Sequence, residues 1–324
     1  MKTGSFGRLL SSLSALALLV AVGSTLAAPG DLYVSDVAGR QILKFTPDGT
    51  RSVFASGLDA VGPLAFDRAG NLFVTAPIQG TILKFAPDGT QTIFASGLSF
   101  PGWPAFDGAG NLFVTESFGD IGDILRFTPS GTKSTFATGG YFSGLCFDLL
   151  GNLVNATAGP TNLSGGLVYY SPDGTVHTFY ETVNGPGVAG PGLAFASGAL
   201  GGVLYAASGD QILVFASPEP GFASGLFNVP DLPAPIGGVF AMGLDGALSL
   251  ALDSAGNLFV SESGNGSILK FAPPNATRST FASGLEGYAY LAFEPVTEKL
   301  RNISARGLVW NRGRGFDWWL YRGR

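Results

Sequence analysis

A phrase of about 40 residues recurs along the chain, and this repeat constrains the fold more than any other feature. Each copy contains four short runs rich in Val, Ile, Phe, Leu and Thr, separated by Pro-Asp-Gly or Asp-x-x-Gly sequences that favour turns. The copies open at Gly30, Gly70, Gly110, Gly151, Gly202 and Gly256, with spacings of 40, 40, 41, 51 and 54 residues. No helical periodicity competes with this pattern, which predicts six copies of a four-stranded unit.

Four antiparallel strands repeated at this spacing are typical of a β-propeller, in which each copy forms one blade. We name the strands a to d from the ring axis outward, and in the second copy expect them at 64–67, 71–75, 82–85 and 93–95. The first copy begins at strand b, whereas Tyr290–Glu294 follows the last copy as a surplus a strand. We therefore expect an all-β, six-bladed propeller, closed by a C-terminal inner strand that joins blade one and removes a free sheet edge.

The two ends of the chain differ from the repeats. Residues 1–27 have a basic start, an apolar run from Leu9 to Val22 and a small-residue end, which predicts a signal peptide and an exported protein, periplasmic, extracellular or on the cell surface. The propeller is expected over 28–296 and a basic, aromatic tail over 297–324. The apolar run is too short to span a bilayer, and no later run is longer, so no transmembrane segment is expected.

Two interpretations of the tail remain open. Residues 300–309 resemble the opening of a short C-terminal module found in secreted bacterial proteins, but Trp310–Tyr321 does not continue it. Shifting the reading frame by one base converts the codons of Trp318 and Trp319 into Gly-Gly, as that module requires. The tail is therefore either a frameshifted copy of the module or a basic segment for membrane surfaces or partners.

The repeat carries a family resemblance. The phrases Asp/Asn-Leu-Phe/Tyr-Val, Ile-Leu-Lys-Phe, Pro-Asp-Gly-Thr and Gly-Leu-Ala-Phe-Asp resemble those of NHL-repeat propellers, and are similar to the SMP-30/gluconolactonase and virginiamycin B lyase-like proteins. The resemblance covers 30–296 and implies the propeller fold. It leaves the activity open, because these relatives include metal-dependent lactone hydrolases, a lyase and binding scaffolds.

The lengths of the connections indicate which face of the ring carries a binding site. Turns a–b and c–d should be uniformly tight, whereas insertions at 156–166 (b–c), 181–191 (d–a) and 227–245 (d–a) should share the opposite face. Long loops on a rigid scaffold commonly carry recognition, although neutral variation of surface loops explains them equally well. The candidate ligand-binding residues in these insertions are Asn162, Asn184, Asn228 and Asp231.

A second candidate site lies where the b strands reach that same face. The sixth residue after each opening glycine is acidic in three copies, at Asp36, Glu116 and Glu262. Converging oxygen ligands suit Ca²⁺, and the gluconolactonase resemblance implies a divalent ion in this region, although its Glu, Asn and Asp ligand set has no residue-by-residue match here. The alternative is that these acids accept backbone N–H bonds at the strand ends.

The single histidine and single cysteine offer little catalytic chemistry. The lyase resemblance implies a histidine base, but His177 falls on an outer d strand, and Cys146 replaces alanine in an inner strand. The Asp-x-x-Gly sequences lack the acid spacing of calcium loops and are interpreted as turns. No catalytic residue is therefore assigned, and whether the chain is an enzyme stays uncertain.

These observations favour an exported binding scaffold. Its partner would be a glycan, a peptide or a protein, and the protein is expected to be a monomer. A metal-dependent lactone hydrolase is the alternative, and a lyase comes third. Acidic residues outnumber basic ones by about 12 within the repeats, whereas the tail carries a net charge of +5, so nucleic-acid binding is not expected.

Overall fold

A computed structural model describes residues 30–118, 121–140, 142–158, 165–181, 192–198, 201–216, 238–273 and 275–295. The leader and tail fall outside these ranges, so the signal peptide and the two interpretations of the tail stay predictions. Every regular element in the described ranges is a β-strand. Accordingly, nothing in the described part of the chain is a helix able to cross a membrane.

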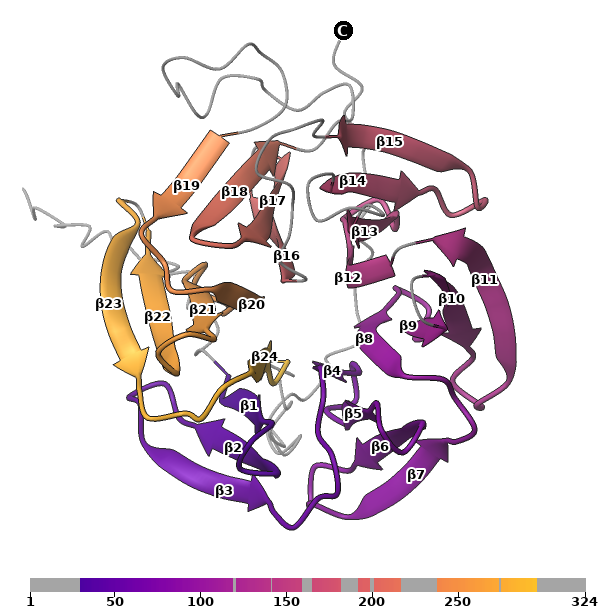
Figure 1. Cartoon of the computed structure of the whole chain (residues 1–324), viewed down its shortest axis with the longest axis horizontal. Helices are drawn as coiled ribbons and strands as arrows, with labels where there is room; N and C mark the ends of the chain where they lie inside the picture. Colours follow the sequence, from indigo (N-terminus) through magenta and orange to yellow (C-terminus); the bar gives the residue numbers. More distant parts are fainter. Residues whose placement is uncertain are drawn as a thin grey trace, which may run out of the picture.

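Six four-stranded antiparallel sheets surround a central axis, which confirms the propeller prediction (Figure 1). We name them blades A to F in ring order. Blade A contains β24 (Ala289–Phe293), β1 (Leu32–Asp36), β2 (Gln41–Phe45) and β3 (Arg51–Ala55). Blade B contains β4 (Leu64–Phe66), β5 (Leu72–Ala76), β6 (Thr81–Phe85) and β7 (Gln91–Ala95). Blade C contains β8 (Pro101–Phe106), β9 (Leu112–Phe118), β10 (Ile121–Phe127) and β11 (Lys133–Gly140).

The remaining blades follow the same order of strands from the axis outward. Blade D contains β12 (Phe142–Phe147), β13 (Leu153–Ala158), β14 (Gly165–Tyr170) and β15 (Val176–Glu181). Blade E contains β16 (Leu193–Gly198), β17 (Gly201–Ser208), β18 (Gln211–Ala216) and β19 (Gly238–Met242). Blade F contains β20 (Ala247–Leu252), β21 (Leu258–Glu262), β22 (Ser267–Ala272) and β23 (Thr277–Ala282). Each d–a connection carries the chain from an outer strand to the next inner strand.

The ring closes as predicted. Strand β24 pairs with β1 so that Tyr290 lies opposite Ser35, and the amide of Glu294 donates to the carbonyl of Asp31 at 2.9 Å. An ion pair between Lys44 Nζ and Asp31 Oδ2, 2.6 Å long, lies beside this junction. The last strand of the repeat region thus completes the first blade, so that β1 pairs with a strand on both sides.

Aromatic side chains join neighbouring blades. Tyr33 of β1 meets Phe54 of β3 and Phe66 of β4 edge to face, both with ring centroids 5.0 Å apart. Phe54 reaches this position because it is the extra residue of a β-bulge between β2 and β3. The c–d pairing is irregular in all six blades. The excess of phenylalanine in the sequence therefore belongs to the seams between blades.

The Asp-x-x-Gly sequences form the a–b turns predicted for them. Asp67 Oδ1 accepts hydrogen bonds from the amides of Ala69 and Asn71, and Asp67 Oδ2 accepts one from Asn71 Nδ2 at 2.7 Å. Gly70 has φ 82°, a conformation that costs glycine least. The same bonds recur around Asp107, Asp148 and Asp253.

Candidate functional site

The three predicted acids lie at or near the ends of b strands, as the repeat indicated. Asp36 and Glu262 end β1 and β21, and Glu116 lies near the end of β9. All three side chains are buried, with exposed fractions of 4%, 3% and 4% respectively. A buried carboxylate requires hydrogen-bond donors, so their partners decide what these acids do.

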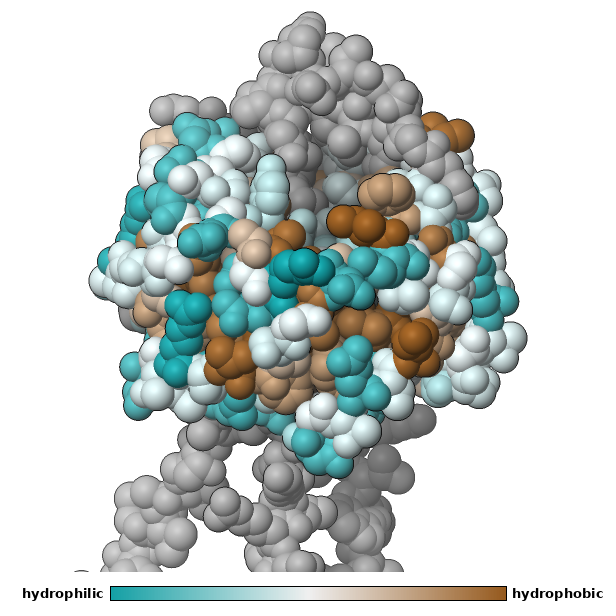
Figure 2. All heavy atoms as spheres, turned by 60° about the horizontal axis from the view of Figure 1, so that its bottom comes forward, coloured by the Kyte–Doolittle hydropathy of each residue, from teal (hydrophilic) through white to brown (hydrophobic). Residues whose placement is uncertain are grey.

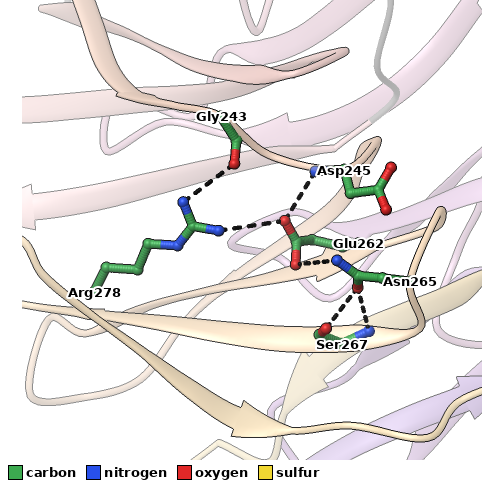
Figure 3. Close-up of polar contacts among 6 residues, drawn as sticks. All are labelled: Gly243, Asp245, Glu262, Asn265, Ser267 and Arg278. Carbon is green, nitrogen blue, oxygen red and sulfur yellow. Dashed lines mark hydrogen bonds and ion pairs between the residues drawn. The ribbon is translucent and has the colours of Figure 1, made fainter.

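Glu262 holds a connection of blade E against blade F (Figure 3). Its Oε1 accepts the amide of Asp245 at 2.9 Å and lies 3.7 Å from Arg278 Nη2, and its Oε2 accepts Asn265 Nδ2 at 3.0 Å. Arg278 also donates to the carbonyl of Gly243 at 3.2 Å. Glu262 therefore fixes the path of the chain from β19 to β20.

Glu116 and Asp36 make comparable contacts. Glu116 Oε1 accepts the amide of Ser99 at 2.5 Å, so it fixes the connection between blades B and C. Asp36 Oδ1 accepts the amide of Gly39 at 3.0 Å, and its Oδ2 accepts Gln41 Nε2 at 2.8 Å. The expectation that these acids accept backbone N–H bonds at strand ends is confirmed.

The same acids are not gathered into one ligand set. Nowhere in the described ranges do three or more His, Cys, Asp or Glu side chains lie together as a group that could hold a metal ion. Each acid serves its own blade and connection instead. The Ca²⁺ site at Asp36, Glu116 and Glu262 stays a prediction.

The predicted position of the third insertion is wrong. Residues 238–242 form β19, the d strand of blade E, and pair with β18, with Gln211 opposite Met242. Residues 217–237, which lie outside the described residues, therefore connect strands c and d of blade E and not strands d and a. The error has a sequence cause: Phe-Ala-x-Gly-Leu, which marks a d strand in other copies, occurs at both 222–226 and 240–244.

The packing of Phe240 selects the second of these two phrases. Its ring contacts Tyr205 of blade E at 5.0 Å and Phe271 of blade F at 5.5 Å between centroids. Strand β13 extends to Ala158, β14 begins at Gly165 and β15 ends at Glu181, so the first predicted insertion is shorter than expected, and both insertions come after the b and d strands of blade D. Within them, Asn162 and Asn184 lie outside the described residues, and so do Asn228 and Asp231 of the third segment.

His177 and Cys146 occupy the positions predicted for them. His177 lies on β15, the outermost strand of blade D, and its ring stacks on Tyr169 with centroids 4.6 Å apart. Cys146 lies on the inner strand β12 and packs against the apolar cluster between blades D and E. Burial raises the pKa of the Cys146 thiol well above its usual range, which disfavours the nucleophilic thiolate.

Two side chains from the inner strands of non-adjacent blades are in contact. Trp103 of blade C contacts Tyr290 of blade A edge to face, with centroids 5.1 Å apart, although blade B separates these two blades in the ring. Both residues are near the start of their inner strands, on the side of the d–a connections. Burial raises the pKa of the Tyr290 hydroxyl. The repeat gave no signal for this pair, because the position is Pro63 in blade B and Gly144 in blade D.

A cavity of about 390 Å³ lies on the opposite side, between the a–b turns of blades B, C and D. Its lining includes Phe66, Phe106, Phe147, Arg68 and Pro295. The turn acids Asp67, Asp107 and Asp148 also line it. Each of these acids already accepts three hydrogen bonds within its own turn, so their arrangement is explained by turn formation.

Comparisons with known proteins support the fold. No protein-family model matches the chain, and no curated protein matches its sequence. Virginiamycin B lyase from Staphylococcus aureus is similar in structure, at 14% identity and a TM-score of 0.55, over 84% of this chain and 93% of that one. A gluconolactonase from Xanthomonas campestris is similar at 15% identity and a TM-score of 0.55, over 82% and 89%. TolB from Acinetobacter baumannii is similar at 15% identity and a TM-score of 0.60, over 82% and 66%.

At these identities the likeness shows the propeller fold alone. The neighbours include two of the three kinds of protein that the repeat phrases resemble, namely virginiamycin B lyase and gluconolactonase propellers. Within the described residues of this chain, the buried acids hold connections in place, and the histidine lies on an outer strand. The described residues therefore form a ring of blades whose connections lie at the surface, and they contain no assigned catalytic group.

Proposed function

We propose that this chain is an exported propeller that binds an uncharged partner on the face formed by its b–c and d–a connections. The observation that carries this proposal is a set of exposed apolar side chains on that face. Ile78, Phe100 and Tyr288 are 77%, 63% and 58% exposed, and Ile121 is 50% exposed. Exposed apolar groups gathered on one face are typical of interaction surfaces.

The surroundings of these side chains support the same conclusion. Connections 77–80 and 96–100 of blade B contain no charged residue, and they lie side by side because the Leu98 amide donates to the Gly80 carbonyl at 3.0 Å. Phe100 has φ 45°, which is rare for a bulky residue and is found where function constrains the backbone. A partner that needs ion pairs would find none in these two connections.

Other surfaces of the propeller show a different distribution. Figure 2, in which blades A and B come forward, shows hydrophobic residues in separate groups among hydrophilic ones. Val53 and Ile93, on the outer strands β3 and β7, are exposed. On the a–b face, Leu149 and Leu150 of blade D are exposed at 58% and 53%. This pair provides a matched control for mutation.

The test is binding of the mature chain to a glycan array and a peptide array. Ile78→Ser with Phe100→Ser should remove the signal, whereas Leu149→Ser with Leu150→Ser should leave it unchanged. Circular dichroism checks that both variants fold. Equal loss in the two variants, or binding that survives the first, would overturn the proposed face.

A metal-dependent hydrolase is the second candidate. It is supported by the fold likeness to a gluconolactonase, although the three buried acids form no common ligand group among the described residues. Calorimetric titration of the mature chain with Ca²⁺ separates the two candidates. Saturable binding that Glu116→Gln and Glu262→Gln abolish would favour the hydrolase, and silence in the micromolar range would favour the scaffold.

A further inference from the structure

The seam between blades C and D brings two buried polar side chains onto facing surfaces. Thr115 of β9 lies two residues after Phe113 and so shares its face of the sheet, and Phe113 contacts Phe147 of blade D with centroids 5.2 Å apart. Asn155 of β13 lies two residues after Leu153, which packs in the same cluster as Phe113. Thr115 and Asn155 therefore both point into this seam.

One side-chain atom of Asn155 accepts no hydrogen bond from the described residues. Its side chain is 0% exposed, and its Nδ2 donates to the carbonyl of Gly144 at 3.1 Å. Because that carbonyl only accepts, the orientation of the amide is settled, and Oδ1 is the atom that has no partner among the described residues. An unpaired buried acceptor destabilises the folded state, because it loses its hydrogen bond to water without gaining another.

The hydroxyl of Thr115 has the opposite problem, because its hydrogen lacks an acceptor among the described residues. It is 2% exposed, and its Oγ1 accepts the amide of Trp103 at 2.9 Å, but no acceptor for its hydroxyl hydrogen lies among the described residues. Two of the equivalent hydroxyls cross their seams, because Ser35 donates to Gly62 and Ser261 to Ala289, both carbonyls of the next blade at 2.7 Å. Thr75 instead donates to the carbonyl of Pro63 in its own blade at 3.1 Å. At the C–D seam this direct bond is missing.

We propose that one internal water molecule bridges the Thr115 hydroxyl and Asn155 Oδ1 between blades C and D. The water accepts from Thr115 and donates to Asn155, which satisfies both buried groups. Buried waters characteristically occupy such positions, where polar groups would otherwise be unpaired. The bridge also explains why blade D keeps an asparagine where blades A, B, C and F have Val34, Val74, Val114 and Val260.

A crystal structure of the mature chain, at a resolution that shows ordered water, tests the bridge directly. The expected result is one water within about 2.7–3.2 Å of both Thr115 Oγ1 and Asn155 Oδ1. A dry seam, or a protein donor bound directly to Asn155 Oδ1, would overturn the proposal. The test is independent of the proposed function, because it involves no ligand.

A double-mutant cycle tests the shared water in solution. Thr115→Val should lower the melting temperature by about 2–4 °C in the natural chain, and by less in an Asn155→Val background, where the second partner of the water is already missing. The lost bond from the Trp103 amide contributes equally in both backgrounds and cancels. Thr115→Ser, which keeps the hydroxyl, is the control. An equal loss in the two backgrounds would contradict the bridge.

Discussion

Blades A, B, C and F share a side-chain arrangement that blade D lacks. In each of the four, an aromatic ring in the b strand lies under a cation from the c strand, about 5 to 6 Å away. The pairs are Tyr33 with Lys44, Phe73 with Lys84, Phe113 with Arg126, and Phe259 with Lys270. Blade D has Val154 at the position of the ring, and Tyr169 stacked on His177 in place of the cation.

The difference shows that the fold tolerates a changed seam and that the changes are not scattered. Blade D also carries the buried amide of Asn155, and both insertions on the b–c and d–a face belong to it. Departures from a locally consistent pattern are expected where function or strain overrides packing. Blade E departs as well, with Val214 in place of the cation opposite Tyr205, so the departures fall in the adjacent blades D and E.

Truncating the equivalent b-strand side chain in blade B and in blade D should give the largest difference in the free energy of unfolding. Phe73 is 3% exposed and meets Phe94 and Phe106 with centroids 5.0 Å away, so Phe73→Ala should cost about 3–5 kcal/mol of unfolding free energy. Val154→Ala at the same position of blade D should cost about 1–2 kcal/mol, the equivalent of two methylene groups. Urea denaturation followed by circular dichroism measures both. Equal losses would mean that the aromatic seams are not the main support of the ring.

Converting blade D to the regular pattern should stabilise the protein. The variant Asn155→Val with Ala156→Ser reproduces Val34-Ser35 of blade A and Val260-Ser261 of blade F. It removes a buried amide and places a hydroxyl at the position from which Ser35 and Ser261 reach a carbonyl of the next blade, so we expect a gain of about 0.5–1.5 kcal/mol, the net contribution of one hydrogen bond. The melting temperature reports the change. As a control, Val74→Asn with Thr75→Ala places the blade D pattern in blade B and should destabilise by a similar amount.

The repeat was sufficient to predict the architecture because each blade is specified locally. The opening glycines, alternating apolar residues and Pro-Asp-Gly turns define each hairpin, and the surplus segment at Tyr290–Glu294 predicts the closing strand. The d strand of blade E was predicted wrongly because the phrase that marks it occurs twice there. Which copy pairs with β18 depends on the contact of Phe240 with blade F. A choice between identical phrases requires tertiary contacts.

The candidate site was less accessible to sequence reasoning. The positions of Asp36, Glu116 and Glu262 followed from the repeat, but their partners come from other connections, such as Ser99 for Glu116 and Asp245 for Glu262. Asn155 is a polar residue in a strand, a pattern that also fits an exposed edge. Its complete burial depends on how blade D packs against blade C.

A smaller effect should follow from removing one cation of the regular blades. Lys84 Nζ lies 5.3 Å from the centroid of Phe73, so Lys84→Met, which keeps the apolar stem, should cost about 0.5–1 kcal/mol. The loss should shrink at high salt, because this pair is near the surface. Lys133→Met on the outer strand β11 is the control and should be nearly neutral. If Lys84→Met and Lys133→Met lower the free energy of unfolding by the same amount, the cation–π contact of Lys84 does not stabilise blade B.

The smallest expected effect is a pH-dependent change in stability that arises from the c–d turn of blade B and not from that of blade C. Hydrogen bonds from Thr90 lower the pKa of the exposed Asp88 carboxyl below its ordinary value, whereas Ser130 occupies the same turn position in blade C. Since the folded pKa lies below the unfolded one, the contribution of Asp88 to stability is present above the unfolded pKa and disappears as the pH falls through the folded pKa. Asp88→Ser, which copies the turn of blade C, should therefore lower the melting temperature slightly at neutral pH and not at all below the folded pKa. NMR titration of the Asp88 carboxyl measures the pKa itself, and a value at or above that of an unstructured aspartate would remove the basis for this contrast.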